Sequence, residues 1–94
     1  VMSCFVYILY SRGHDKYYVG QTPDVETRLK WHNELSEKSY TSRYRPWELA
    51  VMISFPDRRT AIQAERYIKR RKSRVYLRGL IESGEDEPDG AGST

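Results

Sequence analysis

The chain has 94 residues, of which 38% are hydrophobic and 13% aromatic, so it forms one domain with a small, aromatic-rich core. Its only cysteine is Cys4, which excludes an intramolecular disulfide and gives no sign of an oxidising compartment. The longest apolar run, residues 5–10, is too short to span a membrane, and no signal peptide is recognised before it. We therefore expect a cytoplasmic protein with no membrane contact.

The net charge of +3 hides a separation of charge along the chain. Residues 1–81 contain all 16 lysines and arginines and eight acidic residues, which gives +8, whereas residues 82–94 contain five acidic residues and no basic one, which gives −5. A basic body fits a polyanionic partner such as nucleic acid, with a solvated surface as the simpler alternative. The composition of the acidic end is typical of disorder. We expect a folded domain over residues 1–82 and a disordered acidic tail over residues 83–94.

The first 20 residues predict a β-hairpin. Residues 5–10 (FVYILY) form a continuous apolar run rich in β-branched and aromatic side chains, which indicates a buried strand. Residues 11–15 surround Gly13 and predict a turn, after which residues 16–19 return as the second strand.

A helix, a loop and a third strand follow. Residues 22–24 (TPD) predict a helix start, with a capping hydroxyl, a proline at the first helical position and an acid in the first turn. We expect this helix to reach about Asn33 or Leu35. Residues 36–46 are polar, lack periodicity and end in proline, so they predict a loop, and residues 47–55 (WELAVMISF) predict the third strand.

The last part of the folded region predicts two helices. Asp57 can cap the first of them, in which Ala61, Ala64 and Ile68 form one apolar stripe, and Ser73 restarts a shorter one. The order is β-β-α-β-α-α. We therefore expect an α+β fold in which helices flank a three-stranded antiparallel β-sheet.

Two residues of the first helix are candidates for chemistry. Arg28 and His32 lie four apart and share a face, beside the buried stripe that Val25 and Leu29 mark. A structural role is the alternative for each: the arginine stem can cover the core, and a histidine at a helix end is favoured by the dipole.

Glu65 falls within the apolar stripe of the later helix. A carboxylate at such a position is costly unless it is paired or bound to a cation. A salt bridge to Arg28 or to a neighbouring lysine is one explanation. The other is a hard divalent cation such as Mg²⁺, held by one carboxylate, water and a substrate phosphate.

Tyrosine outnumbers phenylalanine by eight to two, and several tyrosines lie on the predicted hairpin. Aromatic cross-strand pairs stabilise a hairpin, so packing is the alternative for any single tyrosine. Packing alone would be served equally well by phenylalanine, which suggests that some of the hydroxyl groups are needed.

The ordered set of these residues resembles the GIY-YIG nuclease superfamily. It comprises VYI at residues 6–8, YVG at residues 18–20, Arg28 and His32, then YTSRYRPWEL, and finally Glu65. The chain is most similar to the small single-domain bacterial members of that superfamily, known as predicted endonucleases. The resemblance extends from about Phe5 to Ile81.

The resemblance implies a role for each matched residue. The hydroxyl groups of Tyr7 and Tyr18 line the active site, Arg28 contacts the scissile phosphate, and His32 lies near the attacking water. Glu65 is the only protein ligand of one metal ion, Mg²⁺ or Mn²⁺.

Three further positions concern the same motifs. Gly20 matches the glycine that gives the backbone room beside the strand end. Val6 replaces the leading glycine of the first triplet, a position that is often variable. Gln21 stands where some repair nucleases of the superfamily have a lysine, so His32 or Tyr7 must move the proton.

Basic residues surround these motifs and are expected to hold phosphates, with tyrosines among them that can stack on unpaired bases. A solvated surface is the alternative here too. The candidate nucleic-acid-binding residues are Lys38, Arg43 and Arg45 in the predicted loop and Lys69, Arg70, Arg71, Lys72 and Arg74 near the last two helices.

These observations lead to one main expectation and one alternative. We expect a monomeric, metal-dependent endonuclease that hydrolyses phosphodiester bonds in DNA rather than RNA, with repair or recombination as candidate pathways. The alternative is a non-catalytic nucleic-acid-binding module that retains the GIY-YIG fold.

Overall fold

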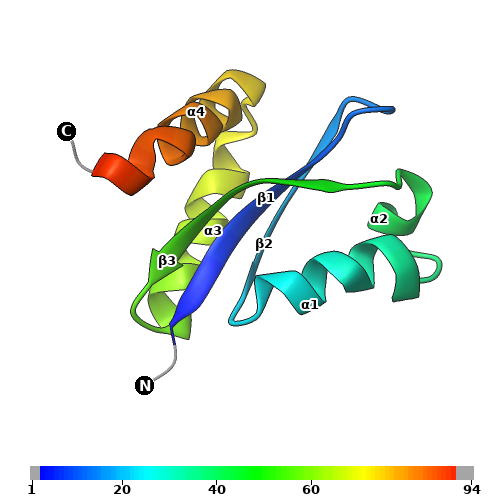
Figure 1. Ribbon diagram of the computed structural model, residues 1–94, viewed down its shortest axis with the longest axis horizontal. Helices are drawn as coiled ribbons and strands as arrows, with labels where there is room; N and C mark the ends of the chain where they lie inside the picture. Colours follow the sequence, from blue (N-terminus) through cyan, green and yellow to red (C-terminus); the bar gives the residue numbers. More distant parts are fainter. Residues whose placement is uncertain (1–2, 91–94) are drawn as a thin grey trace.

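The computed structural model describes residues 3–90, and describes the side chains of residues 3–83. The chain forms a three-stranded antiparallel sheet with helices on both faces, which confirms the expected fold class (Figure 1). The elements are β1 (Cys4–Ser11), β2 (Lys16–Thr22), α1 (Val25–Lys30), the π-helical turn η1 (Trp31–Leu35), α2 (Tyr40–Arg43), β3 (Glu48–Phe55), α3 (Arg58–Arg71) and α4 (Arg74–Gly90).

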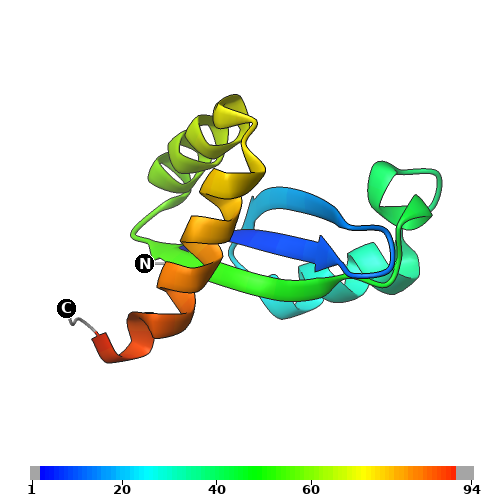
Figure 2. The ribbon, with the colours of Figure 1, turned by 90° about the horizontal axis from the view of Figure 1, so that it is seen from above.

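The strand order is β2-β1-β3, so the first strand is central. β1 and β2 form the predicted hairpin, in which Tyr7 lies opposite Gly20 and Leu9 opposite Tyr18. The register between β1 and β3 shifts between Ile8 and Leu9. Figure 2 shows the three strands from above, with β2 and β3 on the two sides of β1.

Alternation along β1 supplies two separate apolar clusters, one on each face of the sheet. On one face, Val6 and Ile8 pack with Ala61 and Ile68 of α3, and α4 extends this cluster. On the other face, Tyr7, Leu9 and Trp47 pack with Val25 of α1. Because α1 and α3 cover opposite faces, a side chain from α3 can meet Tyr7 only by passing an edge of the sheet (Figure 1).

The first helix begins later than expected. Thr22 still pairs with Phe5 in the sheet, so the N-cap is Asp24, whose side chain accepts a hydrogen bond from the backbone N–H of Thr27. The Thr22 hydroxyl instead accepts from the backbone N–H of Asp24 at 3.1 Å. The helix continues to Leu35 as the turn η1.

The segment predicted as a loop contains the short helix α2. Its N-cap, Ser39, forms a capping box with Ser42. The third strand begins at Glu48 rather than Trp47, whose side chain is buried beside α1. Asp57 caps α3 as expected, through a hydrogen bond of 2.9 Å from the Thr60 N–H.

The boundary between a folded domain and an acidic tail stays a prediction. The backbone of α4 continues as helix to Gly90, where the sequence favoured no regular structure, and residues 91–94 lie outside the described residues. No helix within residues 3–90 is long and apolar enough to cross a membrane.

Candidate active site

Gly20 allows the Tyr7 side chain to lie across the neighbouring strand. The two residues face each other in the sheet, and a Cβ atom built on Gly20 would lie 2.5 Å from the Tyr7 hydroxyl oxygen and 2.6 Å from Cζ. No side chain larger than hydrogen fits under this ring without a shift. Tyr7 therefore starts on the central strand and ends with its hydroxyl over the edge strand β2.

The Tyr7 hydroxyl forms a buried hydrogen bond with His32 of η1. The distance from the hydroxyl oxygen to Nε2 is 3.0 Å, and the opposite ring nitrogen, Nδ1, lies 2.8 Å from Oγ1 of Thr41. Tyr7 and Thr41 are each 2% exposed and His32 is 1% exposed, so these contacts are shielded from bulk solvent. The histidine is thus fixed at both ring nitrogens.

The segment between η1 and β3 folds around this histidine. Thr41 Oγ1 lies 3.2 Å from Oγ of Ser39, which lies 2.5 Å from Oγ of Ser36, so the hydrogen bonds continue along the segment. The indole N–H of Trp47 donates to the carbonyl of Thr41 at 2.8 Å. Arg45 donates to the carbonyl groups of His32 and Ser36. Thr41 is the functional residue that the sequence analysis missed, although it lies in the quoted YTSRYRPWEL run.

Burial sets the protonation states of the pair. Burial, with a smaller contribution from the positive charge of Arg28, lowers the pKa of His32 from 6.5 to about 4. Burial also raises the pKa of Tyr7 to about 12; Tyr18 and Glu65 act in the same direction, and Arg28 opposes them. At neutral pH the pair is therefore a phenol and a neutral imidazole. Each hydroxyl can donate or accept, so a neutral ring meets both contacts in either tautomer; in the one where the Tyr7 O–H donates to Nε2, Nδ1–H donates to Thr41.

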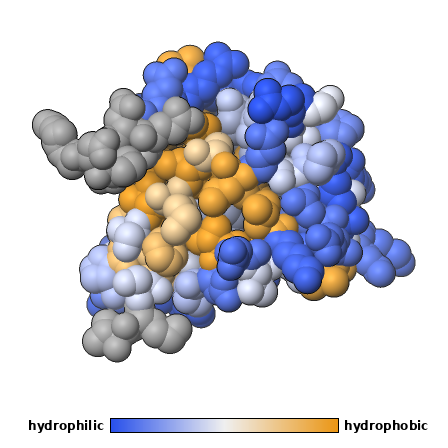
Figure 3. Space-filling model, viewed as in Figure 1, coloured by the Kyte–Doolittle hydropathy of each residue, from blue (hydrophilic) through white to orange (hydrophobic). Residues whose placement is uncertain are grey.

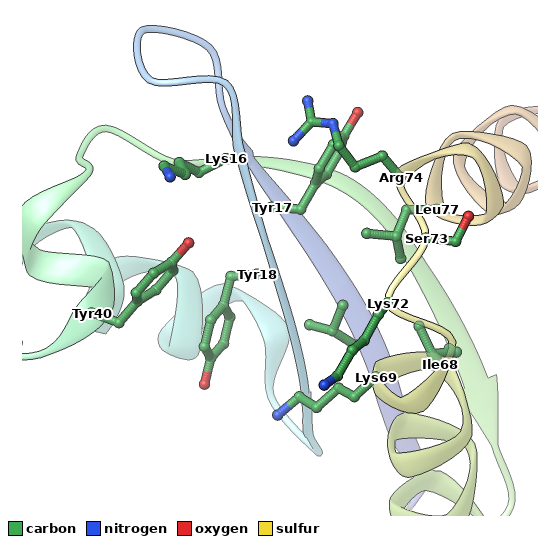
Figure 4. A pocket seen from close by; sticks show the side chains of 11 residues that line it. Lys16, Tyr17, Tyr18, Tyr40, Ile68, Lys69, Lys72, Ser73, Arg74 and Leu77 are labelled. Atoms are coloured by element: carbon green, nitrogen blue, oxygen red, sulfur yellow. The ribbon is translucent and has the colours of Figure 1, made fainter.

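Glu65 reaches this group from α3 at the edge of β2. Its Oε2 lies 2.8 Å from Nζ of Lys69, and this Nζ lies 5.7 Å from the centre of the Tyr18 ring. Figure 4 shows Lys69 extending from α3 across β2 towards Tyr18. The salt bridge that the sequence offered as an explanation of Glu65 is thus present. The Glu65 side chain is partly buried and that of Lys69 is exposed. A surface pair four residues apart on a helix contributes only about 0.3–0.5 kcal/mol, so Lys69 alone does not hold the carboxylate strongly.

Arg28 completes the group from α1. Its guanidinium stacks on the Trp31 ring at 4.3 Å and lies close enough to Tyr7 to lower the pKa of that hydroxyl. The rings of Tyr18 and His32 are 4.8 Å apart, and those of Tyr7 and Tyr18 are 6.3 Å apart. The structure therefore gathers the five residues singled out in the sequence from five different elements.

A metal ion at this position would depend on a single carboxylate. Among the described residues, no group of three or more His, Cys, Asp or Glu side chains could hold a metal. Glu65 is a hard oxygen ligand, and Lys69 already places a positive charge against it. The residues present fit Mg²⁺ or Mn²⁺, since Mg²⁺ is commonly bound by one or two carboxylates with water and substrate phosphates completing its shell.

The basic residues predicted to contact nucleic acid fall into two groups. Arg45 holds backbone carbonyls, Arg74 pairs with Asp15 at 2.6 Å, and Arg71 stacks on Tyr76 at 4.6 Å. These three have structural partners of their own. Lys69 and Lys72 line a cavity beside Tyr18, and the side chains of the remaining three lie exposed on the surface: Lys38, Arg43 and Arg70.

Comparison with known proteins places this geometry in context. The UPF0213 protein YazA of Bacillus subtilis is 37% identical over 76 residues, which cover 78% of this chain and 76% of that protein. The solution NMR structure of the UPF0213 protein BH0048 of Bacillus halodurans superposes with a TM-score of 0.55 at 25% identity, covering 99% of this chain and all of that one.

A second group of relatives is named for an enzymatic activity. The structure-specific endonuclease subunit SLX1 of Cryptococcus neoformans is 45% identical over 51 residues, which are 51% of this chain but 10% of that protein. The chain thus spans about three quarters of YazA and a tenth of this SLX1. The GIY-YIG catalytic domain matches residues 3–78. The chain therefore belongs to the GIY-YIG family.

Proposed function

We propose that this protein is a metal-dependent endonuclease that hydrolyses phosphodiester bonds in DNA. The observation that carries the proposal is the buried contact between the Tyr7 hydroxyl and the neutral His32 imidazole, with Arg28 and Glu65 within electrostatic reach of the same hydroxyl. The SLX1 relatives are structure-specific endonuclease subunits, which supports cleavage of a nucleic acid; DNA as the substrate and repair or recombination as the setting are parts of the proposal.

The proton leaves the attacking water through Tyr7. As the water oxygen attacks phosphorus, its proton passes to the Tyr7 oxygen while the Tyr7 proton passes to Nε2 of His32. The leaving oxygen takes a proton from solvent. The low pKa of His32 keeps its acceptor unprotonated at neutral pH, and Thr41 holds Nδ1–H so that Nε2 faces Tyr7.

Arg28 and Glu65 act on the phosphate. The guanidinium of Arg28, oriented by its stacking on Trp31, presents several donors to the charge that develops on the phosphate oxygens. The Glu65 carboxylate would hold Mg²⁺ or Mn²⁺, whose chemistry there would be Lewis-acid polarisation of the phosphate.

A cleavage assay tests the proposal. Single-stranded, duplex and branched DNA of the same sequence, with the matching RNA strand, are incubated with the protein in Mg²⁺, in Mn²⁺ and in excess chelator. We expect cleavage of at least one DNA that stops in chelator and returns when the metal is restored. Cleavage that persists in chelator would remove the metal from the proposal.

One observation favours the non-catalytic alternative. The salt bridge to Lys69 already accounts for Glu65 without a metal. If the protein binds these nucleic acids but cleaves none of them in either metal, the binding module is the correct interpretation.

A further inference from the structure

A cavity of about 370 Å³ lies against the outer edge of β2. Its walls include the consecutive residues 16–19 of β2. Neighbouring side chains of a strand point to opposite faces of the sheet, so four consecutive residues can line the same cavity only where it lies against the edge of the strand. Tyr40 of α2 forms one side, and the junction of α3 and α4 forms the other (Figure 4). The volume falls in the range of about 300–1,000 Å³ that is typical of pockets for small molecules.

The charge around this cavity is entirely positive among the described residues. Lys16, Lys69, Lys72 and Arg74 line it, and no acidic side chain does. Lys69 pairs with Glu65, and Arg74 pairs with Asp15. Lys16 and Lys72 make no salt bridge with any residue whose side chain is described, so no carboxylate there neutralises either charge. The Nζ of Lys16 lies 5.3 Å from the centre of the Tyr44 ring.

The backbone at Lys72 adds an independent observation. Lys72 is the C-cap of α3 and has φ 48° and ψ 43°, the left-handed conformation in which glycine or asparagine is usual. A lysine there is strained, and strain of this kind is concentrated at functional sites. Figure 4 shows its side chain extending into the cavity, beside that of Lys69 and towards Tyr18.

Aromatic faces lie opposite these charges. The rings of Tyr18 and Tyr40 are 6.4 Å apart with an angle of 29° between their planes, and Tyr40 is 46% exposed. A half-exposed tyrosine in a basic cavity offers a stacking surface for a planar group that also carries negative charge. A nucleotide has both features.

We propose that this cavity binds one unpaired nucleotide next to the phosphate held at the candidate active site. Tyr18 connects the two places, because its ring lines the cavity and lies 4.8 Å from the ring of His32. Lys69 connects them as well, through its pair with Glu65. A base inside a duplex is stacked between its neighbours and cannot present its face to Tyr40, so the cavity selects a nucleotide in a single-stranded segment. The placement of that nucleotide beside the cleaved phosphodiester bond rests on the proposed function, whereas the binding of a nucleotide in the cavity does not.

Equilibrium binding in chelator tests the cavity without any cleavage. The probes are labelled oligo(dT), labelled oligo(U) and a blunt DNA hairpin whose strands are joined by a non-nucleotide linker, so that it has no unpaired base; binding is measured by fluorescence anisotropy. We expect Tyr40→Leu to weaken oligo(dT) binding roughly tenfold while hairpin binding is unchanged, and Tyr40→Phe to bind as the wild type does. Tyr67→Leu, which removes an exposed tyrosine outside the cavity, is the matched control and should change neither affinity.

The lysine is tested on the same probes. Lys72→Gln should weaken oligo(dT) binding and reduce the slope of log affinity against log salt concentration by the amount expected for about one phosphate contact. Lys30→Gln on α1 should change neither the affinity nor this slope. If the variants lose the same fraction of their affinity for oligo(dT) and for oligo(U), the result supports a cavity that recognises the base and the phosphate. If Tyr40→Leu and Lys72→Gln leave single-strand binding unchanged, or weaken hairpin binding by the same factor, the proposal is overturned. A wild type that binds oligo(dT) through Tyr40 but cleaves nothing supports the cavity and rejects the nuclease.

Discussion

The three residues Tyr7, His32 and Thr41 determine where a proton can go. A neutral imidazole donates through one nitrogen and accepts through the other, so the partner of Nδ1 decides what Nε2 can do. In the tautomer that the proposed function uses, Nδ1–H donates to Thr41 at 2.8 Å, which leaves the Nε2 lone pair for Tyr7 at 3.0 Å. Thr41 is therefore a positioning residue, because it acts on Tyr7 only through His32.

Removal of the threonine hydroxyl should slow cleavage. In Thr41→Val the Nδ1–H loses its acceptor, so the tautomer with a lone pair on Nε2 is no longer favoured. We expect the single-turnover cleavage rate to fall roughly tenfold or more with unchanged DNA affinity, since proton transfer contributes about 10²–10⁴-fold in enzymes generally. Thr41→Ser should restore the rate. A Thr41→Val protein that is folded and cleaves as fast as the wild type would refute this role.

His32 should make stability depend on pH in a defined window. Its pKa is about 4 in the folded protein and close to 6.5 when unfolded, so between these values the unfolded chain binds more protons. The contribution of His32 to the free energy of unfolding is therefore complete above pH 6.5. It is lost as the pH drops towards 4, by about 3 kcal/mol in total.

Urea denaturation at pH 7, 6, 5 and 4 measures this dependence. His32→Gln should flatten the curve in that window. Asp15, Asp24 and Asp57 have pKa values held below 3.8 by their hydrogen bonds, so the stability they contribute is lost at lower pH. An unchanged slope in His32→Gln would show that other groups cause the dependence.

Gly20 is the residue most sensitive to a single added methyl group. In Gly20→Ala the new Cβ would lie 2.5 Å from the Tyr7 hydroxyl, so the ring must move and its bond to His32 is lost. We expect a loss of about 1–3 kcal/mol in stability and a loss of cleavage. Gly13→Ala is the control, because nothing lies within 4 Å of its Cβ position. Thermal unfolding and the cleavage assay together check the pair, and equal behaviour of the two variants would contradict the close approach.

At the scale of elements, the connection from η1 to β3 is held by its own polar contacts. The Nε–H of Arg45 donates to the carbonyl of His32 at 2.8 Å, and its Nη2 donates to that of Ser36. Asn33 accepts from the backbone N–H of Trp47 at 2.7 Å and donates to its carbonyl at 3.0 Å. This connection positions Thr41 against the histidine ring.

Arg45 and Arg43 should therefore behave differently when changed. Arg45→Met leaves two backbone carbonyls without their donor, so we expect a loss of about 1–3 kcal/mol in stability. The salt dependence of DNA binding should not change. Arg43→Met should leave the melting temperature unchanged and reduce the salt dependence by about one phosphate contact. The reverse pattern would show that Arg45 binds phosphate after all.

The elements that could be predicted are those with a local signal. The strands follow from apolar and β-branched runs, and α3 follows from its Asp57 cap and its stripe of Ala61, Ala64 and Ile68. The helix α2 has only four residues and depends on tertiary contacts, as does the π-helical turn η1 around His32. The cap of α1 was misplaced because sheet pairing, which holds Thr22, is not a local property.

At the scale of the molecule, the two edges of the sheet differ. The candidate site and the basic cavity lie at the β2 edge. Figure 3 shows apolar residues gathered over the region where β3 and α4 lie in Figure 1, with hydrophilic residues around them. Leu49 and Met52 of β3 are among the exposed apolar side chains, at 38% and 45%. A polyanion is therefore expected to follow the β2 edge.

The motif order predicted which residues would meet, but not how they meet. Tyr7, Tyr18, Arg28, His32 and Glu65 come together because a glycine lets one ring cross a strand and because α3 passes the same strand edge. The cavity could not be predicted, since Lys16, Tyr40 and Lys72 are distant in sequence. No periodicity links these three residues.

Glu65 offers the most direct test of whether this site performs chemistry. Single-turnover cleavage and equilibrium DNA binding are measured in Mg²⁺ for the wild type, Glu65→Gln and Glu26→Gln, the last being an exposed acid on α1. Loss of a metal ligand should abolish cleavage, while DNA affinity stays equal or rises slightly because one negative charge leaves the site. Glu26→Gln should behave as the wild type. If Glu65→Gln cleaves at the wild-type rate in Mg²⁺ and its only defect is a lower melting temperature, Glu65 is a structural partner of Lys69 and the assignment of a metal-dependent nuclease site is wrong.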